Sequence, residues 1–158
     1  MNNHRARCLI LSCGNTLRED DGVGPWLSLW AESRFAGHDG VVILARHQWT
    51  PDLAADLAEA ETAVFIDCSI DAAPGEVRLE SVEAAASDEA LGTHHMGAAE
   101  LLALAKDLYS SLPRRSLMLT IGAGSMELGE QFSPTVQAAL PEACRRLAEA
   151  VEGLLASA

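Results

Sequence analysis

Three acidic residues stand side by side in a short loop of this chain, directly after an apolar run. The run is CLILS, residues 8–12, and the loop GNTLREDDGVG, residues 14–24, contains Glu19, Asp20 and Asp21. Adjacent carboxylates repel one another, and a plain surface turn needs only one such residue. The loop is therefore either a solvated turn, in which Asp20 or Asp21 caps the next helix, or a loop that holds a carboxylate for chemistry.

Two further candidates for chemistry occur far along the chain. Asp67 ends the apolar run AVFID, residues 63–67, where an unpaired buried carboxylate would be costly. His94 and His95 lie in LGTHHMG, just before a helical pattern. The positive end of a helix dipole favours the neutral imidazole, which is the form that binds metal. Asp67 can equally cap the strand exit, and a histidine can cap the helix, so both interpretations stay open.

The elements that would position these residues alternate between strand and helix patterns. Apolar runs predict strands at residues 8–12, 41–45, 63–67, 76–80 and 117–124. Helices are predicted at 24–35, at 50–60 with Thr50 as N-cap, at 96–109, and after the cap-plus-proline pair Ser133-Pro134, with Pro141 kinking or dividing the last one. This alternation predicts a three-layer α/β/α fold, with a mostly parallel twisted sheet and helices on both faces. Ligands in such folds bind beyond the carboxyl ends of the strands, where the acidic loop, Asp67 and His94 can converge.

Two carboxylates and one imidazole, with open coordination positions, suit a borderline divalent ion such as Zn²⁺ or Ni²⁺. On the residues alone, such a metal site is about as well supported as simple capping. Cys68, beside Asp67, is a candidate nucleophile with His94 as its base, but no adjacent basic residue would lower its pKa. Cys13 is either a soft metal ligand or, more simply, a packed residue at a strand end.

Composition narrows the class of protein. The chain has 158 residues, of which 49% are apolar, and a formal net charge of −12. We expect one domain, residues 1–158. The apolar stretches are too short to span a bilayer, and the acidic charge argues against nucleic-acid and membrane partners. Four cysteines without a CxxC pair or a recognisable signal peptide predict reduced thiols in a cytoplasmic protein.

The motifs resemble those of the [NiFe]-hydrogenase maturation protease family. GNTLREDDGVG resembles that family's opening signature, Gly-Asn-x-Leu-x-x-Asp-(Asp/Glu)-Gly-x-Gly. VFIDCS is similar to its second motif, an apolar strand ending in Asp, and THHMG to its third, a Ser/Thr-rich turn followed by His-x-(Leu/Met)-Gly. QFSPTVQAALPEA resembles its Leu-(Ser/Thr)-Pro-x-Val segment. The sequence departs from the family pattern at Ser12, which replaces a glycine, at Ala123, near which proline is usual, and at His95, where the family more often has a polar residue that binds no metal.

The resemblance implies an endopeptidase that removes the C-terminal extension of the hydrogenase large-subunit precursor after nickel insertion, and that recognises the bound nickel. The family's catalytic and metal-contacting residues fall, by position, on Asp21, Asp67 and His94. Asp20 would support or cap the loop, and Gly22 and Gly24 would let the backbone turn close to the substrate.

The resemblance also implies that nickel arrives in the nickel-loaded precursor, with zinc or cadmium able to substitute in vitro. Two alternatives stay open. One is a metal-dependent hydrolase of another small substrate, and the other is a nickel-sensing module that binds the precursor without cutting it.

Overall fold

The structure, a computed structural model, describes residues 5–86 and 96–157. Its elements are β1 (Cys8–Cys13), the short 3-10 helix η1 (Glu19–Gly22), α1 (Val23–Arg34), β2 (Val41–Arg46), α2 (Leu53–Ala58), β3 (Thr62–Ser69), β4 (Val77–Ser81), α3 (Ala98–Tyr109), β5 (Arg115–Gly122) and α4 (Pro134–Ala156). Every strand and helix predicted from the sequence is present and in the predicted order, with its ends shifted by a few residues. No helix in the described ranges is both long enough and apolar enough to cross a membrane.

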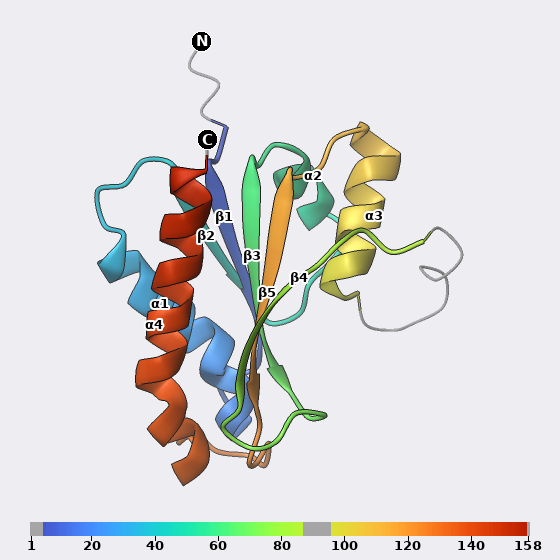
Figure 1. The fold of residues 1–158 in the computed structure, drawn as a ribbon. Coiled ribbons are helices and arrows are strands. Elements are labelled where there is room, and N and C mark those ends of the chain that lie inside the picture. Colours follow the sequence, from blue (N-terminus) through green and yellow to red (C-terminus); the bar gives the residue numbers. More distant parts are fainter. Residues whose placement is uncertain (1–4, 87–95, 158) are drawn as a thin grey trace.

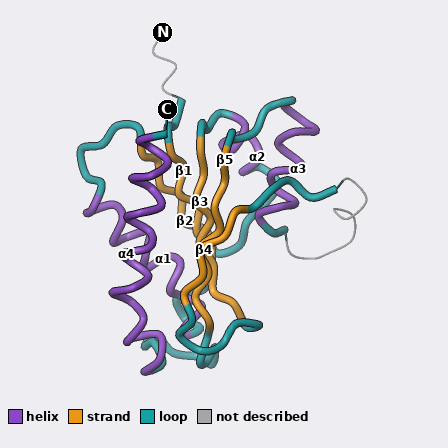
Figure 2. The backbone as a smooth tube through the Cα atoms, in the orientation of Figure 1, coloured by secondary structure: helices purple, strands orange, loops and turns teal. Residues whose placement is uncertain are grey.

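The strands form one sheet in the order β2-β1-β3-β5-β4. The first four of these run parallel, and β4 pairs antiparallel with β5 at the edge. In Figures 1 and 2, α1 and α4 lie on one side of the sheet and α2 and α3 on the other. The three-layer α/β/α prediction is therefore confirmed. Because four strands are parallel, their carboxyl ends meet at one edge, at the bottom of Figure 1.

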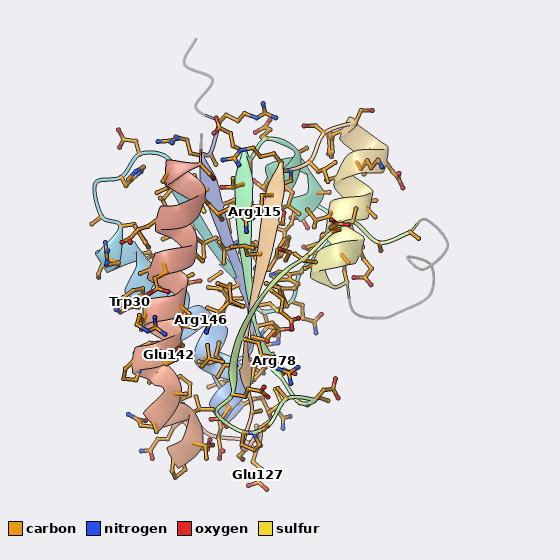
Figure 3. The ribbon with its side chains drawn as sticks, viewed as in Figure 1. Trp30, Arg78, Arg115, Glu127, Glu142 and Arg146 are labelled. Atoms are coloured by element: carbon orange, nitrogen blue, oxygen red, sulfur yellow. The ribbon has the colours of Figure 1, made fainter. Side chains whose placement is uncertain are left out.

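Two apolar cores, one on each face of the sheet, hold the layers together. On one face, Ile10 and Ile66 pack with Leu27 of α1 and Leu147 of α4. The core on the other face is made by alternate residues of the same strands and by α2 and α3, chiefly Leu9, Leu11, Phe65, Leu53, Leu57, Leu101 and Leu102. Burial of both faces explains why the central strands appear in the sequence as continuous apolar runs. The edge strand β4 instead carries charge, since Arg78, labelled in Figure 3, pairs with Glu76 at 2.8 Å.

Of the two outcomes predicted for Pro141, a kink or a division of the last helix, the structure excludes the division. α4 is one helix from Pro134 to Ala156 and is not divided at Pro141. A proline removes a single hydrogen bond from the helix interior, whereas Leu140 and Ala143 on either side of it are buried in the core. Packing therefore keeps the helix continuous. Its start agrees with the prediction, because the Ser133 hydroxyl accepts a hydrogen bond from the Val136 N–H at 3.5 Å.

The second helix is shorter than predicted. α2 begins at Leu53 and its N-cap is Asp52, so the prediction of Thr50 as N-cap is wrong. Residues 50–53 instead form a turn, in which the Leu53 N–H donates to the Thr50 carbonyl at 3.1 Å. The Thr50 hydroxyl donates to the Asp52 carboxylate within that turn. The Thr-Pro pair marks a turn before the helix rather than the helix start.

Candidate active site

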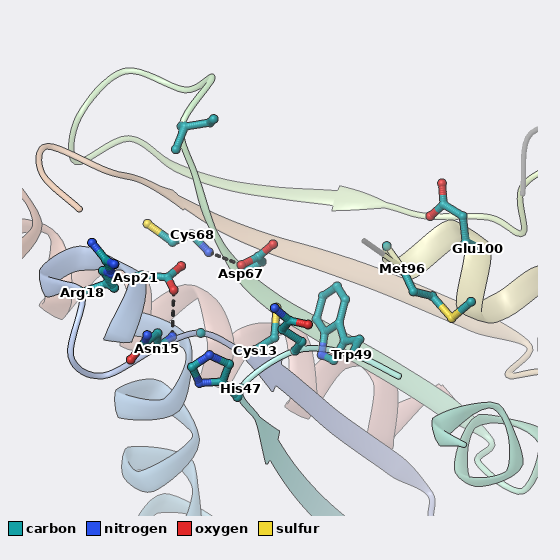
Figure 4. Close-up of a pocket in the computed structure, with 14 residues that line it drawn as sticks. Cys13, Asn15, Arg18, Asp21, His47, Trp49, Asp67, Cys68, Met96 and Glu100 are labelled. Atoms are coloured by element: carbon teal, nitrogen blue, oxygen red, sulfur yellow. Dashed lines mark hydrogen bonds between the residues drawn. The ribbon is translucent and has the colours of Figure 1, made fainter. Parts of the chain in front are cut away.

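A cleft of about 700 Å³ opens at the carboxyl edge of the sheet. Its walls come from four segments that are distant in sequence: residues 13–21 after β1, 47–49 after β2, 67–70 at the end of β3, and 96–100 at the start of α3. Figure 4 shows the side chains that line it. The cleft therefore lies where the parallel topology predicts a ligand site.

Asp21 is the acid of η1 that faces this cleft. Its Oδ2 accepts a hydrogen bond from the Asn15 N–H at 2.7 Å, drawn as a dashed line in Figure 4. The Asn15 side chain in turn accepts from the Leu17 N–H at 2.9 Å, which tightens the turn before η1. One carboxylate oxygen of Asp21 is thus held by the loop, and no described residue donates to the other.

Asp20, the adjacent residue, is fully buried and makes a different set of contacts. Its carboxylate accepts from the N–H groups of Gly124, Ser125 and Ser133, at 2.7, 2.9 and 2.7 Å, and from the Ser133 hydroxyl at 2.7 Å. Burial by itself raises the pKa of Asp20, but these four hydrogen bonds outweigh it and hold the pKa below its usual value. Asp20 therefore fastens η1 to the loop between β5 and α4.

Asp67 enters the same cleft from β3. The sequence had suggested that Asp67 ends the strand, but the strand continues to Ser69, so Asp67 lies within it. Its Oδ1 accepts from the Cys68 N–H at 2.8 Å, and the Cys13 thiol also hydrogen-bonds to its side chain. Burial raises the pKa of Asp67, and the nearby charge of Asp21 adds to this, against the opposing effect of the two hydrogen bonds. The structure thus brings Asp21 and Asp67 together in one cleft.

His94, the third predicted site residue, lies outside the described residues, as does His95. Met96 and Gly97, which follow directly, line the cleft at the start of α3. Within residues 5–86 and 96–157, no group of three or more His, Cys, Asp or Glu side chains is arranged to hold a metal ion. The described part of the chain accordingly supplies two of the three predicted metal-contacting residues.

The two cysteines of the cleft are poor candidates for nucleophiles. Burial, followed by the charges of Asp21 and Asp67, raises the pKa of the Cys68 thiol to about 12. Burial also raises the pKa of Cys13, and the charge of Asp67 raises it further. A thiol that stays protonated near neutral pH attacks a carbonyl poorly. Cys13 instead acts as a hydrogen-bond donor to Asp67.

The glycines of the acidic loop allow close contact between backbone segments. Gly22 has an ordinary helical backbone, with φ −75° and ψ 0°. A Cβ on Gly24 would lie 2.5 Å from the Cys13 carbonyl oxygen, so this glycine lets α1 pack directly on the end of β1. The position that requires glycine by conformation as well is Gly14, with φ 152°, where a Cβ would lie 1.9 Å from the Asp21 carbonyl oxygen. The structure thus shows a packing role for Gly24, and the approach of Gly22 and Gly24 to the substrate stays a prediction.

Sequence reasoning missed the wall of the cleft that follows β2. His47 and Trp49 lie there, and Glu100 lies on the facing wall, in the first turn of α3. Trp49 is only 6% exposed and packs edge-on against Phe65, with ring centroids 5.4 Å apart. The signal that could have found His47 is the strand-end rule, applied to the run at residues 41–45 as it was to the runs at 8–12 and 63–67.

The fold and the cleft define an α/β protein of the doubly wound class, with two carboxylates at its ligand edge. No family model matches the chain, and a comparison with curated proteins also finds no match. Solved structures do match. A hydrogenase 2 maturation peptidase from Thaumarchaeota archaeon SCGC_AB-539-E09 is 26% identical with a TM-score of 0.67, over 92% of this chain and 97% of that one.

Two further structures agree with it. The [NiFe] hydrogenase maturation protease HybD from Thermococcus kodakarensis is 27% identical with a TM-score of 0.65, over 90% of this chain and 97% of that one. The maturating endopeptidase HybD from E. coli has a TM-score of 0.77 over 93% of both chains, and at 22% identity it supports the fold alone. The resemblance expected from the sequence is therefore confirmed, because the chain is similar over nearly its whole length to solved hydrogenase maturation peptidases.

Proposed function

We propose that this protein is an endopeptidase that removes the C-terminal extension of a [NiFe]-hydrogenase large-subunit precursor after nickel has been inserted, and that it recognises the bound nickel. The observation that carries the proposal is the convergence of Asp21 and Asp67 from separate elements on one cleft, in a fold shared with maturation peptidases. Hydrolysis adds water across one peptide bond and leaves a new C-terminal carboxylate and a free peptide.

Nickel enters this proposal as cargo of the substrate. Carboxylate oxygens together with one imidazole suit a borderline divalent ion, and Asp21 and Asp67 contribute the carboxylates. His94 is the proposed third contact. Because a completion check must not strip nickel from its substrate, we expect the protein alone to bind nickel, zinc or cadmium weakly. Calorimetric titration should show this weak binding abolished in Asp67→Ala and in His94→Ala, and binding that both variants retain would exclude the assignment.

The cytoplasm is the proposed site of the reaction. All four cysteines are free thiols in the structure, which fits a reducing compartment.

The proposed function is tested by incubating the purified protein with nickel-loaded and nickel-free precursor and measuring the intact mass of each product. We expect the nickel-loaded precursor alone to lose the mass of its C-terminal extension. Binding of the precursor without any loss of mass would instead support a non-catalytic nickel-sensing module. If the protein neither cleaves nor binds the precursor, the alternative is a metal-dependent hydrolase of another small substrate.

A further inference from the structure

Two exposed leucines lie next to each other at the carboxyl edge, outside the cleft. Leu17 is 55% exposed and Leu128 is 75% exposed. Their loops run side by side, because the Gly129 N–H donates to the Leu17 carbonyl at 2.9 Å and the Glu19 N–H donates to the Gly129 carbonyl at 2.8 Å. Leu17 and Leu128 are called the leucine ridge below.

The backbone beneath the ridge is fixed. In addition to the two hydrogen bonds between the loops, the Asp20 N–H donates to the Ser125 carbonyl at 3.1 Å, and the buried Asp20 carboxylate joins the same two segments. Single exposed leucines are common on protein surfaces. Two that adjoin on a hydrogen-bonded backbone form a small apolar surface whose position is set before a partner arrives.

The ridge adjoins the cleft through the loop that carries Leu17. Leu17 lies between Asn15 and Arg18, and both of these line the cleft wall beside Asp21. A cleft of about 700 Å³ has the volume of a small-ligand site. A folded protein that inserts one segment into it must therefore also rest on the surface around its mouth, where the ridge lies.

The charge beside Leu128 is negative. Glu127 and Glu130 flank Leu128 in sequence, and both are exposed. Neither forms an ion pair with a described residue. Figure 3 shows Glu127 at the lower extremity of the molecule, on the carboxyl side of the sheet. A complementary partner surface would carry apolar side chains with lysine or arginine beside them.

We propose that the leucine ridge docks the folded body of the precursor, on an apolar and basic surface next to the segment that enters the cleft. This proposal rests on the proposed function, because it takes the same precursor as the partner. It adds a contact that needs no nickel. The ridge should therefore contribute equally to binding of the nickel-free and the nickel-loaded precursor.

The test measures binding of the purified nickel-free precursor to the immobilised protein, together with steady-state cleavage of the nickel-loaded form. Leu128→Asp should raise Kd about 10-fold or more, the scale of losing a central apolar contact. It should raise KM similarly and change kcat less than about two-fold, because saturating precursor restores the complex. Leu108→Asp is the matched control, since Leu108 is 62% exposed on α3 and should leave both constants unchanged.

A second variant tests the charge. In Glu127→Gln/Glu130→Gln, binding should be weaker at low salt and should depend less on salt than in the unaltered protein. Equal Kd and KM for Leu128→Asp and the unaltered protein would overturn the docking surface and leave the proposed function standing. If the unaltered protein neither binds nor cleaves the precursor, both proposals fail.

Discussion

The neighbouring carboxylates of Asp20 and Asp21 in η1 lie in different environments. Asp20 is fully buried and accepts four hydrogen bonds, whereas Asp21 faces the cleft and accepts one, from Asn15. Glu19, the third acid, lies against Gly129, where its Cγ would be 3.2 Å from an added Cβ. The run of acids thus divides into a structural residue, a cleft residue and a surface residue.

Asp21→Asn tests the cleft residue. It should lower the rate of precursor cleavage by ~10²-fold or more, the scale of losing one positioned catalytic group. Asn15 can still donate to the amide oxygen, so the loop should keep its conformation. Single-turnover cleavage of nickel-loaded precursor measures the effect, with Glu19→Gln as a control that should cleave nearly normally. Full activity of Asp21→Asn together with loss in Glu19→Gln would show that the functional position in the loop is misassigned.

Asp67→Asn should abolish cleavage and leave the protein folded. Burial makes the charged form of Asp67 unfavourable, as its raised pKa shows, so a neutral amide of the same shape should keep or raise the melting temperature. Thermal unfolding followed by circular dichroism, with a parallel cleavage assay, measures both effects. Asp71→Asn, an exposed acid in the loop after β3, should change neither. An unfolded Asp67→Asn whose folded fraction still cleaves would make Asp67 a structural cap.

At the scale of the elements, the apolar patterns of the sequence predict which strands and helices form, but they do not predict the residues at which these begin and end. The run of residues 63–67 predicts β3, but the strand continues to Ser69 because pairing with β5 extends through Ser69 and Gly122. The pairing partner of a strand is not visible in its own sequence. The start of α2 was predicted wrongly for a similar reason. Thr50 and Asp52 can both act as the N-cap, and the turn formed by residues 50–53 decides between them.

Asp20→Ala should destabilise the domain by about 3 kcal/mol or more. It leaves the part-buried N–H donors of Gly124, Ser125 and Ser133 without their acceptor, and each such loss is costly. Urea denaturation measures the free energy of unfolding. Glu130→Ala removes an exposed acid of the loop that follows β5 and should change stability little. A comparable loss in both variants would mean that general charge, and not these contacts, sets the effect.

Replacement by alanine should have opposite effects on stability at two helical glycines, Gly24 in α1 and Gly153 in α4. Gly24→Ala should destabilise by about 1–3 kcal/mol, because its Cβ would lie 2.5 Å from the Cys13 carbonyl oxygen. Gly153→Ala should stabilise by about 0.5–1 kcal/mol, because nothing lies within 4 Å of the new Cβ and alanine favours a helix. Both are read from urea unfolding curves. If Gly24→Ala is as stable as Gly153→Ala, then α1 is not packed as closely on β1 as described.

At the scale of the whole molecule, the two cores place one ionisable thiol deep inside. Cys8 is fully buried on the α1/α4 face, and burial raises its pKa to about 11 against an opposing hydrogen bond to Thr62. The folded state therefore holds a proton that the unfolded chain releases near pH ~8.5. The stability that Cys8 contributes is complete below that pH and is lost as pH rises towards 11.

Cys8→Ala should consequently flatten the alkaline loss of stability. Between about pH 9 and 10.5, the free energy of unfolding of the unaltered protein should fall more steeply than that of Cys8→Ala, by up to about 1.4 kcal/mol per pH unit. Urea denaturation at several pH values gives both slopes. The absolute stability of Cys8→Ala can be lower at every pH, because a core side chain is shortened, without affecting this comparison. Identical slopes would show that the Cys8 thiol titrates alike in both states.

The topology explains which site residues the sequence could predict. Asp21 and Asp67 were found because both follow or end apolar runs of parallel strands, and the structure places both in the cleft. His47 obeys the same rule at β2 but was overlooked, and Glu100 had no signal, since an acid in the first turn of a helix is ordinary. The residue types alone could not tell Asp20 from Asp21, because the donors to Asp20 lie more than a hundred residues away in sequence, and only the family resemblance assigned Asp20 a supporting role.

The hydrogen bonds of Asp20 that hold η1 against the loop after β5 also affect the conformational entropy lost when substrate binds. A wall that is already ordered in the free protein loses little conformational freedom when a partner arrives. Substitutions that loosen the fastening without unfolding the domain would restore that freedom, and their first effect would be on how fast and how tightly the precursor associates. The contacts between Asp20 and Ser133, which are distant in sequence, should therefore affect the rate at which the precursor associates.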